Sequence, residues 1–462
     1  MSSNTTTTDD QSPAAHTRLT ARNFNGYAAV VFMLGTATVG FGAVDLAMIA
    51  PKGVDHVAAV GQGDLLILGI YSFFQGAVEA FSSRLSVAEG AERTAQRLPA
   101  LLAALLTILI ISQFLGSAIA YGSETVISWF GQSPDQVPLV GDYVQVRSHA
   151  VALVIIYWIS NESLKICGAR NLTFVVLGLG FVINAALDWL FLYTSWGVDL
   201  FATPESAVAT STVAAQVVMA ACSAWMFVRL LRKRGIPLAK PERKPVFEEL
   251  RGMSRLALGV GARNVNDYTG SIVPVMLIGT LGVPVMAASL VATKIYTLFC
   301  RVPQACFESS FVHYGYWAGG SAAEGRSAAV RILLRRAAIP TAVATVLTAL
   351  ASPWLVGLFS GEGLDRTLAV VLVLAYLLYV PLYFAEQFLG KLLVVHRLGG
   401  VLFAASTAAT YLLVIPLAWC SVNLLHSPFA AVACKGIASA ALTLVFYRAY
   451  RRSSRAITEG TA

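Results

Sequence analysis

Three polar residues stand in apolar stretches where a charge or an amide is costly to bury. Asn184 and Asp188 occur four residues apart in FVINAALDWLF (181–191), so both lie on one face of a helix. Asp45 follows the apolar stretch GFGAV. A charged Asp at the centre of a bilayer costs at least about 2.5 kcal/mol, so such a residue faces a cavity or a partner, or holds a proton. We therefore predict that Asp45, Asn184 and Asp188 form a proton or cation site.

Structural interpretations of these residues stay open. Asp45 could accept hydrogen bonds at a kink near the outer mouth, where Ala50 and Pro51 end the helix. Asn184 alone could join two helices, since amides commonly pair across membrane helices. If the two carboxylates lie close together in a low dielectric, they cannot both ionise cheaply. At least one of them should then hold a proton.

A second group of charges falls in the latter half of the chain. Arg263 and Asp267 lie four residues apart in ARNVNDYTG, and Glu386 stands in PLYFAEQFLGK. Arg263 and Asp267 could simply form an ion pair within one helix. The alternative is that they belong, with Glu386, to a cation or substrate site in this half.

Lys294, Arg301 and Glu308 recur at seven-residue spacing, so all three lie on nearly one helical face. Arg301 and Glu308 could lie near the cytoplasmic helix end and snorkel to the interface. Lys294 is nearer the middle of the helix. We add Lys294 and Glu308 to the predicted site, and Lys294 leads us to expect a zwitterionic or anionic cargo.

Membrane helices must position all these residues. The 462-residue chain is 56% hydrophobic and 13% charged, with a mean hydropathy of +0.68, which excludes an ordinary soluble domain. About 20 apolar residues cross a bilayer, and such segments recur along almost the whole chain. The predicted class is an all-α integral membrane protein of twelve helices, at 27–50, 60–82, 98–121, 143–166, 172–194, 207–231, 254–280, 284–308, 333–358, 367–393, 400–424 and 428–448.

The basic residues predict the topology. Most of the 33 Lys and Arg fall in alternate connections and in the two tails, which indicates that both termini are cytoplasmic. The net charge of +8 therefore reflects membrane orientation, and we expect no nucleic-acid partner. The predicted location is the bacterial inner membrane, with the lipid bilayer as surroundings and a monomer as the expected state.

The chain also contains a weak internal repeat. VDLAMIAPKGVDHVAAVGQGD (44–64) aligns without a gap on VPVMLIGTLGVPVMAASLVAT (273–293), an offset of 229 residues. An even number of helices in each half predicts two parallel lobes, related by a pseudo-two-fold axis along the membrane normal. The predicted division is a disordered tail at 1–26, a first lobe at 27–231, a basic linker at 232–253, a second lobe at 254–448 and a tail at 449–462.

The chain resembles the multidrug and toxic compound extrusion (MATE) transporters. The resemblance lies in VDLAMIAPKGVDHVAAVG, AEGAERTAQRL and ARNLTFVVLGLGFVINAALDWLF, and it spans nearly everything after residue 26. It implies a two-lobed antiporter driven by a cation gradient, and it places Asp45, Asn184 and Asp188 at the proton site of the first lobe. It also suggests that the first helix is the element that bends.

In the second lobe the resemblance is less complete. Asp267 matches the acid of the seventh helix in the sodium-coupled branch, whereas Glu386 is shifted from that branch's second acid. CFESSFVHYG (306–315) resembles the proton-linked, DinF-like branch more closely, so protons are favoured over Na⁺ as the coupling ion. A lipid-linked saccharide flippase and a sodium-coupled antiporter are the alternatives. We predict a transporter and not an enzyme, with no cofactor and no metal site.

Overall fold

Long apolar runs fold into helices because a backbone that crosses lipid must satisfy its own hydrogen bonds. The computed structural model describes residues 17–129, 135–237, 241–320, 326–358 and 365–458. Of the predicted tail at 1–26, residues 1–16 lie outside the described residues. The first lobe comprises α1 (Ala21–Ile49), η1 (Ala50–Lys52), α2 (Val54–Gly90), α3 (Thr94–Trp129), α4 (Gln136–Ser148), α5 (Val151–Ile166), α6 (Leu172–Tyr193), α7 (Ser195–Leu200) and α8 (Pro204–Lys233).

The second lobe repeats the order of the first. It comprises α9 (Arg243–Gly279), α10 (Val283–Phe299), α11 (Arg301–Gly320), α12 (Arg326–Leu358), α13 (Arg366–Leu378), α14 (Val380–Val395), α15 (Gly399–Ala409), the π-helical η2 (Thr410–Val414), α16 (Ile415–Asn423) and α17 (Pro428–Thr458). Because α9 already begins at Arg243 and α17 runs to Thr458, parts of the predicted linker and of the predicted C-terminal tail are helical.

Twelve membrane-crossing units result. Among the described residues, eight helices are long and apolar enough to span a membrane, and two bent pairs, α4 with α5 and α13 with α14, bring the number to ten. The helices α1 and α9 complete the twelve. At 1.5 Å per residue, the 29 residues of α1 extend about 44 Å, more than the roughly 30 Å of a hydrocarbon core.

The two lobes share irregularities at the offset that the sequence predicts. Gly53 begins α2 with φ 139°, and Gly282, 229 residues later, begins α10 with φ 121°. Such backbone angles favour glycine, which has no Cβ. The break between α4 and α5 (50°) recurs at the same offset between α13 and α14 (42°). Matching turns and bends show that the predicted two-lobed repeat is correct.

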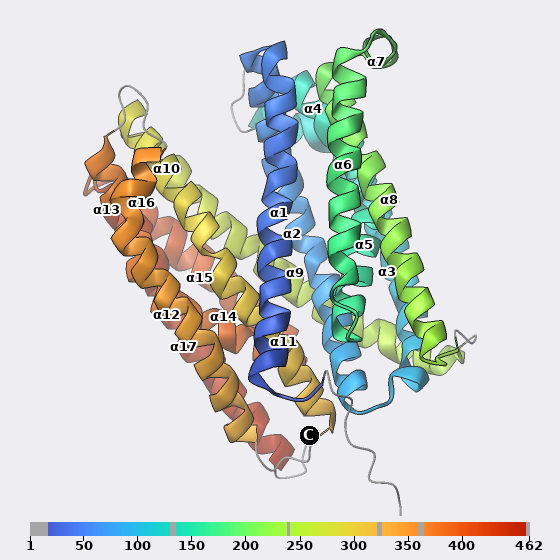
Figure 1. Cartoon of the computed structure of the whole chain (residues 1–462). Coiled ribbons are helices and arrows are strands. Elements are labelled where there is room, and N and C mark those ends of the chain that lie inside the picture. Colours follow the sequence, from blue (N-terminus) through green and yellow to red (C-terminus); the bar gives the residue numbers. More distant parts are fainter. Residues whose placement is uncertain (1–16, 130–134, 238–240, 321–325, 359–364, 459–462) are drawn as a thin grey trace, which may run out of the picture.

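The lobes meet closely at one end only. In Figure 1 the helices α10, α12 and α13 lean away from α1 and α6 at the top, and the two groups converge toward the C-terminus. We call this C-terminal end the base. Between the lobes, a Cβ on Gly76 of α2 would lie 2.4 Å from the carbonyl oxygen of Ala257 and 2.4 Å from the amide nitrogen of Gly261, both of α9. Glycine lets the two backbones touch there.

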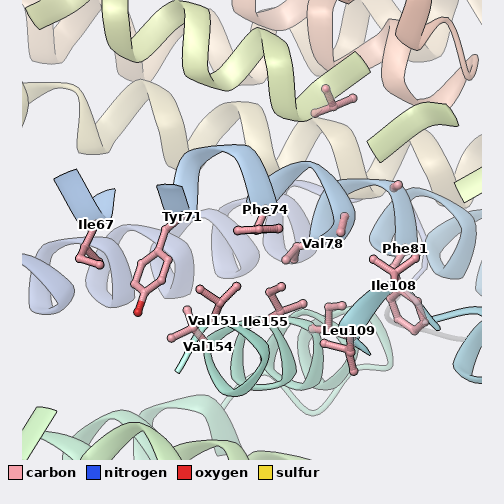
Figure 2. Packing of buried hydrophobic residues seen from close by; sticks show 14 of the residues in the cluster. Ile67, Tyr71, Phe74, Val78, Phe81, Ile108, Leu109, Val151, Val154 and Ile155 are labelled. Atoms are coloured by element: carbon pink, nitrogen blue, oxygen red, sulfur yellow. The ribbon is translucent and has the colours of Figure 1, made fainter. Parts of the chain in front are cut away.

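The interior of the first lobe is apolar. Figure 2 shows Ile67, Tyr71 and Phe74 of α2 facing Val151 and Val154 of α5, all of them buried. Large apolar side chains elsewhere lie on the outer surface, such as those of α3 and α12. An apolar surface of this kind fits lipid rather than water.

The predicted eighth span is too short. In the structure this span runs from Val283 to Gly320, with a break at Cys300 between α10 and α11. The predicted span ends at residue 308. Arg301 and Glu308 therefore do not lie at the end of this span. Arg301 stands near the middle of the span, so the snorkelling interpretation is wrong for this residue.

Candidate functional site

Three helices of the first lobe converge on a buried carboxylate pair. The Nδ2 atom of Asn184 in α6 donates to Asp45 Oδ1 of α1 at 2.7 Å and to Asp188 Oδ2 one turn further along α6 at 2.9 Å. The three side chains are at most 3% exposed. The fold thus brings together the three residues that the sequence selects, and one amide nitrogen bridges both acids.

Hydroxyl groups of α8 hold the other carboxylate oxygens. Thr212 Oγ1 donates to Asp45 Oδ2 at 3.0 Å, and Ser211 Oγ donates to Asp188 Oδ1. Both hydroxyls also lie within hydrogen-bond distance of the carbonyl oxygen of Val208. Each carboxylate oxygen therefore has a donor, which favours the ionised form. Burial opposes it, because charge in a low dielectric is costly.

One polar atom in this cluster has no partner. The Oδ1 atom of Asn184 is buried without a hydrogen-bond partner among the described residues. A carboxylate offers no hydrogen, whereas a protonated carboxyl group can donate one. The unpaired carbonyl is thus an acceptor available to Asp45 or Asp188 once either carries a proton, and the arrangement can accommodate both protonation states.

The nearest buried cation stands outside this hydrogen-bonded cluster. Arg147 of α4 is 6% exposed and lies 4.0 Å from Asp64 of α2. Its guanidinium group lies over the rings of Tyr71 and Tyr143, at 5.9 and 5.8 Å. Uncharged donors, rather than this arginine, make the described hydrogen bonds to the carboxylate pair.

In the second lobe, Gln387 of α14 connects three of the predicted site residues. Arg263 of α9 donates to Gln387 Oε1 at 2.8 Å, and Gln387 Nε2 lies 3.4 Å from both Asp267 Oδ2 and Glu386 Oε1. Arg263 also pairs with Glu386 at 3.9 Å, and Ser439 donates to Glu386 Oε2 at 2.8 Å. The structure thus joins Arg263, Asp267 and Glu386 in one network.

Asp267 forms an ion pair with a lysine that the sequence did not single out. Lys435 of α17 lies 3.0 Å from Asp267 Oδ1 and 2.5 Å from Ser271 Oγ. Asp267 is therefore paired with α17, and Arg263 with α14. An ion pair between Arg263 and Asp267 within α9, which the sequence left as an alternative, therefore does not explain their contacts.

The remaining two predicted residues lie elsewhere. Glu308 of α11 and Glu79 of α2 both bind Lys391 of α14, with Nζ to oxygen distances of 2.6 and 2.8 Å. Lys391 therefore joins the two lobes. Lys294 of α10 is exposed and is not part of the network of Arg263, Asp267 and Glu386 among the described residues.

The sequence patterns did not single out four residues of these networks, for a common reason. The four are Ser211, Thr212, Lys391 and Lys435. Their partners lie on other helices, and no spacing along the chain connects a hydroxyl of α8 with an acid of α1. A usable signal existed for Lys435, which is a base in the apolar run AAVACKGIASAAL (430–442). Buried bases in such runs are as informative as buried acids.

Comparisons with known proteins agree with this architecture. The MatE family model matches residues 31–190. The multidrug resistance protein NorM of Burkholderia vietnamiensis is 25% identical over 278 residues, which cover 60% of this chain and 58% of NorM. The multidrug resistance protein MdtK of Yersinia pestis (strain Pestoides F) is 23% identical over 380 residues, 80% of each chain.

Solved structures show the same fold. A crystal structure of MATE in the straight conformation superposes with a TM-score of 0.78 at 15% identity, covering 97% of this chain and 100% of that one. An outward-facing multidrug resistance MATE family transporter gives a TM-score of 0.73 at 16% identity, with the same coverage of both chains.

Fold and site together define a two-lobed integral membrane protein with a carboxylate pair buried in the first lobe. The chain is similar in sequence to the MatE family over residues 31–190 and shares the fold of the solved MATE structures. Its placement in the DinF-like branch stays a prediction.

Proposed function

We propose that this protein is a secondary active transporter that exports a small organic molecule across the bacterial inner membrane in exchange for protons. The observation that carries the proposal is the pair Asp45 and Asp188, bridged by Asn184 and buried in the first lobe. The match of residues 31–190 to the MatE family model and the multidrug resistance names of similar proteins support export as the activity.

The carboxylate pair would couple protons to helix movement. When both acids are ionised, Asn184 and Thr212 tie α1 to α6 and α8 through Asp45. A proton on Asp45 weakens these bonds, because a neutral carboxyl group is a poorer acceptor. Protonation then loosens the outer end of α1, where Asp45 lies, and changes the wall of the first lobe. Cargo and proton would thus each stabilise a different conformation of α1.

Alternating access would use the contact between the lobes. The two lobes converge at the base in Figure 1, and Lys391 joins Glu79 of α2 in the first lobe to Glu308 of α11 in the second. Opening toward the base requires this bridge and the contact of α2 with α9 to separate. We propose that the base faces the cytoplasm, in line with the basic residues, and that the transporter acts as a monomer.

Geometry in the second lobe favours protons over Na⁺. The ammonium group of Lys435 already lies 3.0 Å from Asp267, so a tethered cation stands at the acid that the sodium-coupled branch uses. The expected cargo remains zwitterionic or anionic. Its basis moves from Lys294, which is exposed, to Arg263, which is buried in this lobe.

Transport in everted membrane vesicles tests the proposal. We expect uptake of cargo candidates to stop when the pH gradient is collapsed with a protonophore and nigericin, and to continue when the Na⁺ gradient alone is removed. Uptake that follows only the Na⁺ gradient would overturn proton coupling. Translocation of a lipid-linked saccharide without either gradient would favour the flippase alternative.

Asp45→Asn provides the matching test within the site. Asn resembles a permanently protonated Asp in shape and charge, so this variant should fold and bind cargo but lose gradient-driven export. Asp188→Asn should lose nearly as much. Asp55→Asn, an exposed acid at the start of α2, is the matched control and should export normally. Robust export by Asp45→Asn would show that the buried acid is structural.

A further inference from the structure

The pseudo-symmetry of the lobes leads from the carboxylate pair to a second pocket of different character. At the 229-residue offset, Pro274 of α9 stands where α1 has Asp45. The sixth helices also correspond, because α8 begins at Pro204 and α17 at Pro428. In that register, Lys435 stands where α8 has Ser211. The second lobe thus lacks the acid of α1 and gains a cation.

A cavity of about 220 Å³ lies at this place in the second lobe. Its wall includes Pro274 and Lys435, together with Asp267 and Arg301. The cavity wall therefore contains two cations and one carboxylate. Lys435 is paired with Asp267, and Arg301 has no ion pair with a carboxylate of this wall among the described residues.

Arg301 is poorly satisfied by the protein itself. Its Nη1 atom donates to Gln304 Oε1 at 3.0 Å, and its Nε atom is buried without a hydrogen-bond partner among the described residues. Arg301 also lines the adjacent cavity of about 170 Å³ between the lobes. A guanidinium group with an unused donor at the junction of two cavities is suited to a carboxylate, whose oxygens accept such bonds.

Aromatic rings also line this cavity. Tyr296 and Tyr376 stack with ring centroids 4.5 Å apart and an interplanar angle of 18°, and Tyr379 lies 6.0 Å from Tyr296. The Nζ atom of Lys435 lies over the ring of Tyr383, 5.7 Å from the ring centroid. An apolar cavity of about 150 Å³ can hold benzene, so this larger one has room for one or two fused rings.

We propose that this cavity binds the aromatic carboxylate portion of the cargo. The ring would pack against Tyr296 and Tyr376, and the carboxylate would bind Arg301, with Lys435 nearby. This inference rests on the proposed export function. It adds the place of binding and the chemical class of the cargo, and it assigns protons to the first lobe and the organic anion to the second.

Binding of two matched probes tests the site without any gradient. The full chain in nanodiscs of phosphatidylethanolamine and phosphatidylglycerol is titrated with 2-naphthoate and with its neutral analogue 2-naphthamide. We expect naphthoate to bind at least about ten-fold more tightly, because only the carboxylate neutralises the surplus cation. Equal affinities for the two probes would overturn the proposal on the unmodified protein.

Variants then locate the site. Arg301→Gln should abolish the preference for naphthoate, Arg301→Lys should retain part of it, and Tyr376→Leu should weaken both probes alike. Lys294→Gln is the matched control, since this cation of the same span is not part of the cavity wall. An unchanged preference in Arg301→Gln, or its loss in Lys294→Gln, would contradict the assignment.

Failure of the site and failure of the export function are distinguishable. If naphthoate binds as expected but no organic compound is exported under a pH gradient, the site stands and the function fails. If a cationic dye is exported under the gradient while naphthoate and naphthamide bind equally, the function stands and the site fails.

Discussion

At the scale of single residues, Asn184 is the centre of the carboxylate site. Its one nitrogen donates to both acids, and its oxygen is left unpaired among the described residues. Thr212 and Ser211 add one donor to each acid. A hydrogen bond to a charged group contributes roughly 1.5–3 kcal/mol, so these donors decide how readily the acids release a proton.

Removal of such a donor should move the pH dependence of transport. In Thr212→Val the ionised form of Asp45 loses a bond, so the proton is released only at higher pH and the transport profile shifts toward alkaline values. The shift should be about one pH unit, since roughly 1.36 kcal/mol corresponds to one unit. Asn184→Ala removes two bonds and should shift the profile further. Initial rates across a pH series in proteoliposomes measure both.

Thr210→Val is the control for this series. Its hydroxyl bonds to the carbonyl oxygen of Ser206 on the same helix. We expect an unshifted profile. If Thr212→Val and Asn184→Ala also keep the original profile, then these donors do not act on the coupling acid.

At the scale of helices, contact between α2 and α9 depends on glycine. A Cβ on Gly76 would meet the backbone of α9 at 2.4 Å, whereas a Cβ on Gly61 of the same helix meets nothing within 4 Å. Gly76→Ala should therefore lower the free energy of unfolding by about 1–3 kcal/mol, the usual effect of overpacking. Gly61→Ala should be neutral or slightly stabilising. Thermal unfolding in nanodiscs compares the two, and equal midpoints would contradict the close contact.

The ion bridge between helices should control the opening of the base. Lys391→Gln leaves Glu79 and Glu308 without their shared cation. Glu79→Gln removes the ion pair across the lobes but keeps the pair of Lys391 with Glu308. Both variants should increase the population with an open base. Spin labels at the exposed positions Arg93 and Arg331 report the distance between the lobes.

Lys165→Gln is the matched control for the ion bridge. Lys165 is also a buried lysine, and it pairs with Glu162 within α5, so the contact does not cross the lobes. We expect its label distances to equal those of the unmodified protein. Unaltered distances in both Lys391→Gln and Glu79→Gln would remove the bridge from the proposed mechanism.

At the scale of the whole molecule, the two lobes share one backbone plan and differ in charge. The first lobe buries two acids under hydroxyl and amide donors, whereas the second places Lys435 and Arg301 around a tyrosine-lined cavity. Duplicated folds commonly place their binding sites near the interface of the repeats. This difference in charge is the basis of the proposal that the first lobe binds the proton and the second lobe the organic anion.

The orientation of the whole molecule can be tested directly. We expect a protease site added after the C-terminus to be cut in everted vesicles and protected in right-side-out vesicles, because the basic residues predict a cytoplasmic base. A site inserted beside Asp199 in α7, which lies at the opposite end in Figure 1, should show the reverse. The opposite cleavage pattern would invert the proposed direction of transport.

The sequence by itself determined the features that depend on near neighbours along the chain. Apolar runs of about 20 residues gave the membrane helices, the 229-residue offset gave the two lobes, and the four-residue spacing placed Asn184 and Asp188 on one face. Asp45 stood out because an acid in an apolar run is costly wherever its helix packs.

Only the tertiary structure decided which helices face each other. Lys435 meets Asp267, Lys391 meets Glu79, and Thr212 meets Asp45, each across more than 150 residues of chain. These contacts depend on helix tilt, rotation and the breaks at Cys300 and at residues 149–150, and the helical period does not encode them. Lys294 is another example. Its spacing predicted that it shares a helical face with Arg301 and Glu308, but not that its side chain would be exposed.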